Sequence, residues 1–262
     1  MRYVFHSMRM LLRSATQYRA SFVMQTLSQV VMTGGDLLAV LVLMDRFTAL
    51  GQWTADEILF FFGVMQVPFA LCEFLNRGLG TFSGMIVRGG FDTLLLRPKS
   101  LLLQVICSQL DPRRIGSVVI GAAALAVSSA HMSLRWTWGG ALLLLSAVLG
   151  TLLMLTGLFI LEAVINIFSV RAVEAVNILT YGGRSACQYP VDIYPKPLRV
   201  LFTYIAPIAL CLHLPVSVIL GKPLMNVPAW VACLGPLVGV AFFLMMTQVW
   251  RLGVRHYRST GT

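Results

Sequence analysis

Charged residues are scarce in this chain. They make up 11% of its 262 residues, whereas hydrophobic residues make up 58%. Soluble domains usually carry about 25% charged residues, so the composition excludes an ordinary soluble protein. The length allows roughly six apolar spans of about 20 residues with short connections. We therefore expect an all-α membrane protein in which residues 1–262 form one transmembrane domain.

Lysine is rarer still, since Lys99, Lys196 and Lys222 are the only three. None of them follows the loop G-x-x-x-x-G-K-[ST], whose backbone amides hold nucleotide phosphates. The sequence also has no glycine-rich dinucleotide turn and no nucleophile elbow. We expect a chain that is not an enzyme, has no ATPase site and binds no cofactor of its own.

Cysteine and histidine do not cluster. The five cysteines are isolated and lie mostly within apolar runs, so they predict neither a disulfide framework nor a structural zinc site. Cys211 and His213 form the closest pair, and we assign them to packing. We expect no metal site.

The net charge of +10 has a membrane explanation. Basic residues flank apolar spans, where they set orientation and contact anionic lipid, so we expect no nucleic-acid partner. We assign 14 of the 20 basic residues to the cytoplasmic side and six to the outside, which predicts a multi-pass protein of the cytoplasmic (inner) membrane with both termini cytoplasmic. The six outer residues are Arg46, Arg135, Arg184, Lys196, Arg199 and Lys222.

Residues 1–20 lack the uninterrupted apolar core of a cleavable signal. Val4, Met8, Leu11 and Leu12 can share one helical face, which favours an interfacial amphipathic helix. The alternative is a basic leader before the first span. The expected spans are 22–44, 55–76, 115–130, 139–160, 172–187 and 229–250. Thr54 and Glu57 have the spacing of a capping box at the start of the second span.

Residues 88–104 interrupt the apolar pattern between the second and third spans, and we expect a coupling segment over residues 80–100. Leu94 to Leu96 suit a short docking helix that ends before Pro98, because proline disfavours helical geometry at Arg97. A partner protein would meet an apolar knob with a basic rim.

Several polar residues lie within the expected spans. Asp36 follows two glycines in the first span, and a charge in hydrocarbon costs about 2.5 to 3.5 kcal/mol, so it should face other helices or water. Five more are candidates for a substrate path. For Gln66, Glu73 and Asn76 the alternative is a subunit seam. For Asn166 and Asn177 the alternative is hydrogen bonding between helices.

Residues 190–228 are rich in proline yet contain a strongly apolar run. Broken backbone at membrane depth is tolerated only where protein or a water-filled cavity covers it. We expect a re-entrant hairpin with one helix over residues 198–205, a turn at residues 206–207 and a second helix to about residue 220. This hairpin could gate the outer end of a path. The gate candidates are Tyr189, Pro190, Tyr194, Pro195 and Pro207.

Six runs in order along the chain resemble the ABC-2 type permease subunits of ABC transporters. They are 53–59 (WTADEIL), 90–98 (GFDTLLLRP), 181–183 (YGG), 189–195 (YPVDIYP), 207–209 (PIA) and 249–261 (VWRLGVRHYRSTG). The second and fourth runs are the most specific.

This resemblance implies a half-transporter with six spans, an N-terminal interfacial helix, a coupling helix and a re-entrant hairpin. It also implies two permeases, identical or not, and two copies of a separate ATPase that binds ATP and Mg²⁺. Members generally export lipophilic compounds, drugs or lipid-linked cargo. The residues expected to meet the ATPase are Phe91, Asp92, Leu94, Leu95, Arg97 and Pro98.

Other readings remain open. An importer or a translocase of lipid or glycan carriers would share this architecture. A secondary transporter would need no ATPase, and the lack of an internal repeat argues mildly against it. A membrane enzyme acting on lipids would need clustered reactive side chains at the interface, which the sequence does not provide.

Overall fold

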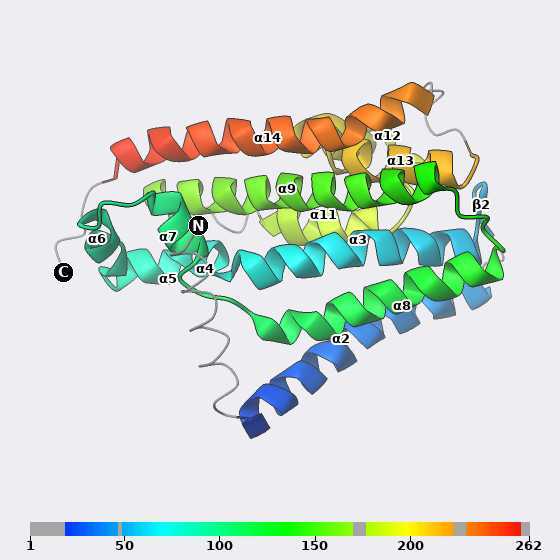
Figure 1. The fold of residues 1–262 in the computed structure, drawn as a ribbon, viewed down its shortest axis with the longest axis horizontal. Coiled ribbons are helices and arrows are strands. Elements are labelled where there is room, and N and C mark those ends of the chain that lie inside the picture. The colour runs from blue at the N-terminus through cyan, green and yellow to red at the C-terminus, as the bar shows by residue number, and fades with distance from the viewer. Residues whose placement is uncertain (1–18, 47–48, 170–176, 223–228, 258–262) are drawn as a thin grey trace.

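The computed structural model describes residues 19–46, 49–169, 177–222 and 229–257, and these are almost entirely helical (Figure 1). Five described helices are long and apolar enough to cross a bilayer, which confirms helices of spanning length at the first, second, third, fourth and sixth predicted spans. They are α2 (Arg19–Arg46), α3 (Ala55–Leu75), α8 (Ile115–His131), α9 (Trp138–Phe168) and α14 (Ala229–Arg255).

The fifth predicted span is described only from residue 177 onward. This part consists of the π-helical turn η3 (Ile178–Gly182) and α11 (Gly183–Cys187). It is shorter than a bilayer crossing by itself, and residues 172–176 lie outside the described residues. The predicted interfacial helix at 1–20 also lies outside them, except for its last two residues, which begin α2.

The proline-rich segment forms two helical arms that meet at 83°. The first arm comprises α12 (Lys196–Val200) and η5 (Leu201–Ile205), and the second comprises η6 (Ala209–His213) and α13 (Leu214–Ile219). Ala206 leaves the helical region (φ −115°, ψ 85°) because the ring of the following Pro207 disfavours it there. The predicted helix, turn and helix are confirmed, and the pair is a sixth span only if both arms cross together.

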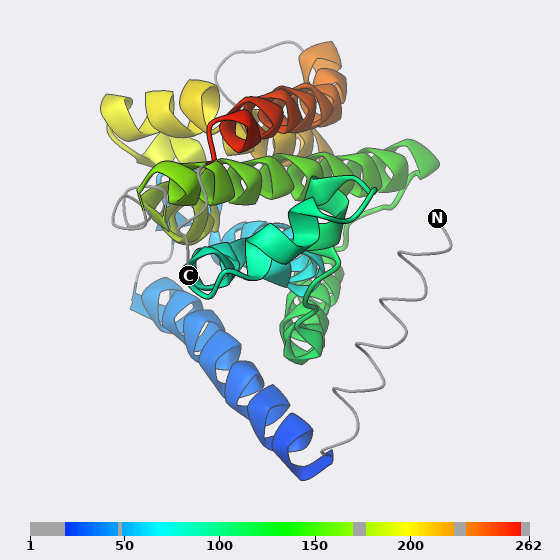
Figure 2. The same cartoon turned by 90° about the vertical axis from the view of Figure 1, so that its left-hand side faces the viewer.

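Helix α3 is the centre of the domain. It packs between α8 and α9, and its phenylalanines point into the core on all sides. Helices α2, α8 and α14 instead expose most of their apolar surface, as helices that face lipid or another subunit do. Helix α2 leans away from the other helices toward its N-terminal end (Figure 2). A Cβ on Gly239 would lie 2.1 Å from the Gly150 carbonyl oxygen, so α9 and α14 pack backbone to backbone.

The two ends of the bundle differ in character (Figure 1). One end, called the basic end below, carries the final turn of α14 and a series of short helices. These are α4 (Arg77–Gly80), α5 (Phe82–Val87), α6 (Gly90–Leu95), α7 (Leu101–Ile106) and the 3₁₀ turn η1 (Pro112–Arg114). The opposite end carries the antiparallel strands β1 (Ala49–Leu50) and β2 (Trp53–Thr54), joined through Gly51 at φ +66°. Near them lies the 3₁₀ turn η4 (Val191–Ile193).

Candidate functional site

Glycine breaks the basic end into short helices. Gly89 adopts φ +67° between α5 and α6, a conformation that other residues rarely take. A Cβ on Gly78 would lie 1.9 Å from the Val105 carbonyl oxygen, so only glycine lets α4 pass this close to α7. The predicted coupling segment is therefore a folded layer that closes this end of the bundle.

Phe91 fastens α6 to the end of α14. Its ring is fully buried, with its centroid 5.0 Å from that of Phe82, 6.4 Å from that of Trp250 and 4.9 Å from that of Tyr257. Burial and the neighbouring Asp92 carboxylate raise the pKa of Tyr257. We call Phe82, Phe91, Trp250 and Tyr257 the aromatic anchor. Two residues predicted to meet an ATPase, Phe91 and Asp92, thus face the chain's own C-terminal helix.

The end of α6 points away from the bundle. Leu94 is half-buried, Leu95 is 40% exposed and Leu96 is 86% exposed, and Arg97 and Pro98 are exposed after them. Helix α6 runs over Gly90–Leu95, so it begins four residues before the short helix predicted at Leu94 to Leu96 and ends one residue sooner. The exposed residues Leu95 to Pro98, called the knob below, are an apolar tip beside a positive charge.

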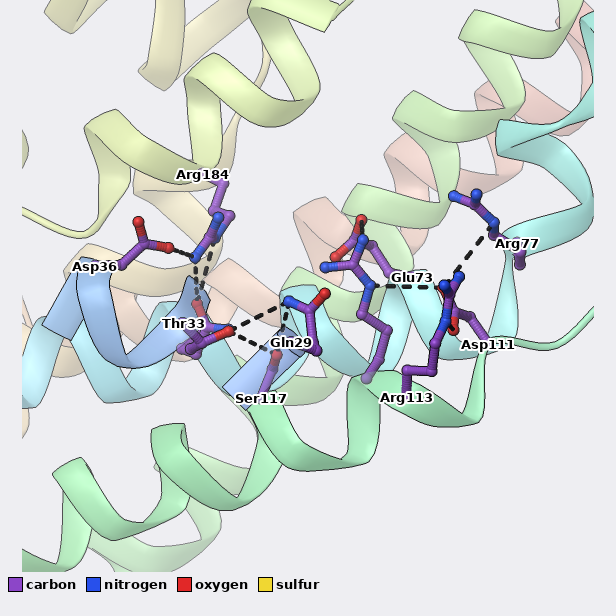
Figure 3. A network of polar contacts seen from close by, with 11 residues as sticks. Gln29, Thr33, Asp36, Glu73, Arg77, Asp111, Arg113, Ser117 and Arg184 are labelled. Atoms are coloured by element: carbon purple, nitrogen blue, oxygen red, sulfur yellow. Dashed lines mark hydrogen bonds and ion pairs between the residues drawn. The ribbon is translucent and has the colours of Figure 1, made fainter. Parts of the chain in front are cut away.

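A network of ion pairs lies at the junction of α3 with η1 (Figure 3). Arg114 Nη2 lies 2.8 Å from Glu73 Oε1, and the Arg113 guanidinium donates two hydrogen bonds to the Asp111 carboxylate. Arg77 approaches the same carboxylate at 4.0 Å. Both acids are buried, so the pairing offsets their desolvation. The path candidate Glu73 therefore joins helices.

A second network lies near the middle of α3 (Figure 3). The Arg184 guanidinium forms an ion pair with Asp36, donates to Gln66 Oε1 at 2.9 Å and lies 5.2 Å from the centroid of the Phe69 ring. Arg184 was expected on the outside, and its side chain contacts Gln66 near the middle of α3. Asp36 pairs with a charge from another helix. This agrees with the expectation that Asp36 faces other helices or water, because a charge in hydrocarbon is costly in free energy.

Hydroxyl and amide groups join α2 to α8 close to this ion pair. Thr33 Oγ1 lies 2.7 Å from Ser117 Oγ, and Gln29 Nε2 donates to both hydroxyls. Figure 3 shows these three side chains converging between the two helices. Such bonds stabilise packing where no water competes.

The remaining path candidates lie in separate surroundings. Asn76 Nδ2 donates to Thr156 Oγ1 of α9 at 3.0 Å. Asn166 is buried on α9, and Asn177 is half-buried just before η3. For Gln66, Glu73 and Asn76 the structure gives partners on other helical elements, namely Arg184, Arg114 and Thr156.

The gate candidates frame the bent pair of helical arms. Tyr189 is half-buried, Pro190 and Pro207 are buried, and Pro195 is exposed. Tyr194 donates its hydroxyl to the Ala186 carbonyl at 2.9 Å, and burial raises the pKa of Tyr194 to about 12, which keeps this donor protonated.

Sequence reasoning missed a network that ties this segment to the β1–β2 hairpin. Asp192 accepts hydrogen bonds from Trp53 Nε1 and Gln52 Nε2, each at 3.0 Å. Lys222 Nζ donates to Glu57 Oε2 at 2.6 Å and to the Gln52 carbonyl at 2.7 Å. Glu57 also accepts from the Thr54 amide at 2.7 Å, which confirms its part of the capping box. The one indication of this network in the sequence was an acidic residue, Asp192, within a proline-rich segment.

His213 contacts the proline-rich segment from the core side. Its Nδ1 accepts a hydrogen bond from the Val191 amide, so Nε2 carries the proton donated to the Cys187 carbonyl at 2.9 Å. The ring is fully buried, with its centroid 5.1 Å from that of Phe61. Cys211 is buried as well. Both side chains thus occupy packed positions, in agreement with their assignment to packing.

Spanning helices, buried ion pairs between them and a short-helix layer at one end define a multi-pass helical membrane protein. The family model described as ABC-2 family transporter protein matches residues 30–261. The chain belongs to this family, which confirms the resemblance identified from its motifs. No match was found among curated proteins or among solved structures.

Proposed function

We propose that this chain is the permease subunit through which a separate ATPase drives export of a lipophilic compound across the cytoplasmic membrane. The knob is the observation that carries the proposal. It is an apolar tip that faces away from the bundle, yet its base is fixed to α14 by Phe91. A partner that pushes the knob therefore moves a spanning helix.

Contacts between helices continue from the knob toward the opposite end. Helix α14 carries Trp250 near the basic end and packs against α9 along its length. Further along, a Cβ on Gly235 would lie 2.4 Å from the Leu210 carbonyl oxygen, which puts α14 directly against η6 of the bent pair. In this proposal the push on α6 shifts α14, and the bent pair opens as the outer gate.

The rest of the proposed assembly is the one typical of ABC-2 transporters. Two ATPase copies bind ATP and Mg²⁺ below the basic end, and a second permease, identical or homologous, completes the pathway. Both termini lie in the cytoplasm. Polar side chains such as Asn166 and Asn177 are candidates for contact with the substrate.

The knob is tested by Leu95→Asp in the assembled complex. A carboxylate at this position puts a charge into an apolar contact. We therefore expect ATP hydrolysis to continue while transport of a fluorescent lipophilic cation falls by about tenfold or more. Such a fall corresponds to a loss of more than about 1.4 kcal/mol of binding free energy at the interface. Leu95→Met keeps an apolar side chain and should transport normally. Full transport by Leu95→Asp would refute the docking role, and greater accumulation of the cation in cells that contain the active complex would refute export.

A further inference from the structure

A cavity of about 400 Å³ opens between α7 and the last turns of α14. Arg251 and Arg255 form its charged wall, and because they are four residues apart on one helix their side chains emerge on the same face. Both are exposed. Ser100 and Thr247 add hydroxyl groups, and the residues that line the cavity include no acid.

The other main part of the cavity lining is apolar. It is formed by Leu101 and Leu102 of α7 with Trp250 and Val254 of α14. The apolar run of α14 ends at Trp250, and arginine follows at once. An apolar helix that is followed directly by arginines is typical of the boundary between hydrocarbon and headgroups, which favours a position of the cavity near the phospholipid phosphates.

We propose that this cavity binds the headgroup of an anionic phospholipid. Arg251 and Arg255 bind the phosphate, since guanidinium groups bind phosphate oxygens through paired N–H donors. The first carbons of the acyl chains lie against Leu101, Leu102 and Val254. The volume lies within the usual range of small-ligand sites. A free phosphate would leave the apolar wall unused, which is why we assign the site to a lipid.

This site is independent of the proposed transport function, but it adjoins the short helices at the basic end. Trp250 belongs both to the cavity and to the aromatic anchor, where its ring centroid lies 5.4 Å from that of Phe82. A bound lipid therefore lies one side chain away from the base of α6.

The test measures phospholipid retained by the purified full-length chain in native mass spectrometry, with phosphatidylglycerol titrated against phosphatidylcholine. We expect the wild type to retain phosphatidylglycerol selectively and the double variant Arg251→Gln/Arg255→Gln to bind it at least about tenfold more weakly, as expected from the loss of charge-assisted hydrogen bonds. Arg135→Gln removes an exposed arginine elsewhere and should bind like the wild type.

Two further measurements use the wild type alone, so they do not depend on the folding of a variant. Retention of phosphatidylglycerol should weaken as salt rises, because ions screen exposed charges, and millimolar inorganic phosphate should not displace it. Any one of four results would overturn the assignment. They are equal retention of phosphatidylcholine, binding that does not depend on salt, displacement by inorganic phosphate, and unchanged binding in the double variant.

Discussion

Asp192 is the acid that holds the β1–β2 hairpin against the proline-rich segment. Its carboxylate receives N–H donors from Trp53 and Gln52, and its carbonyl receives Arg199 Nη2 at 2.6 Å. Hydrogen bonds to a charged acceptor contribute more than neutral ones do, about 1.5–3 kcal/mol each. The Asp192 side chain therefore links the β1–β2 hairpin to the proline-rich segment, and its main-chain carbonyl adds a contact with Arg199 of α12.

Replacing Asp192 with Asn tests that link. The amide keeps the shape but loses the charge, so we expect unfolding of the protein in detergent to become easier by about 1.5–3 kcal/mol, seen as a lower midpoint in tryptophan fluorescence. Asp45→Asn removes the charge of an exposed acid near the same end and should change little. Equal shifts in the two variants would contradict the role of Asp192.

The ion pair between Asp36 and Arg184 makes a prediction about coupling between two mutations. Arg184→Gln leaves Asp36 without its countercharge, and breaking a buried pair in this way typically costs about 3–5 kcal/mol. The cost here should fall below that range, because Asp36 is 45% exposed. The double variant Arg184→Gln/Asp36→Asn should be more stable than Arg184→Gln alone in a double-mutant cycle of thermal unfolding. Additive effects would show that the pair contributes no interaction energy.

Sequence reasoning predicted that Asp36 needed a polar environment but not which residue supplies it. The cost of a charge in hydrocarbon is local and can be read from Asp36 alone. Its partner Arg184 is distant in the sequence and lies within the fifth predicted span, whose boundaries have few polar markers. The pairing of Asp192 with Trp53 was also missed. These two residues are distant in the sequence as well, and both belong to short connections without periodicity.

Among the elements, α6 has a buried base and an exposed tip, which sequence reasoning did not distinguish. The motif from Gly90 to Pro98 suggested one surface for a partner, whereas the structure splits it into a buried base and an exposed tip. Helices of spanning length were predictable because an apolar run of about 20 residues is itself the signal. The contact of Phe91 with the end of α14 depends on tertiary packing, which no local pattern reports.

Phe91→Ala tests the base of α6. Removing a fully buried ring typically costs about 3–5 kcal/mol, and here the loss should fall on the short helices α5 and α6. We expect faster amide hydrogen exchange over residues 82–96 than in the wild type. Phe168→Ala truncates an exposed ring and is the matched control. Unchanged exchange in Phe91→Ala would show that the aromatic anchor does not hold α6.

At the scale of the whole molecule, the proposed protein partner docks at the basic end and the proposed gate lies at the opposite end. The family assignment gives the chain its place in an ABC-2 transporter, and the structure connects the two ends through α14. The apolar faces that α2 and α8 leave exposed are the surfaces available to lipid or to a second permease.

A photo-crosslinking amino acid at position 96 tests the central claim most directly. Leu96 and Trp138 are similarly exposed, at 86% and 89%, but lie at opposite ends of the bundle (Figure 1). In intact cells we expect position 96 to form a covalent product with a nucleotide-hydrolysing subunit and position 138 to form none. Capture of that subunit from position 138, or its absence from position 96 in cells that transport normally, would contradict the account.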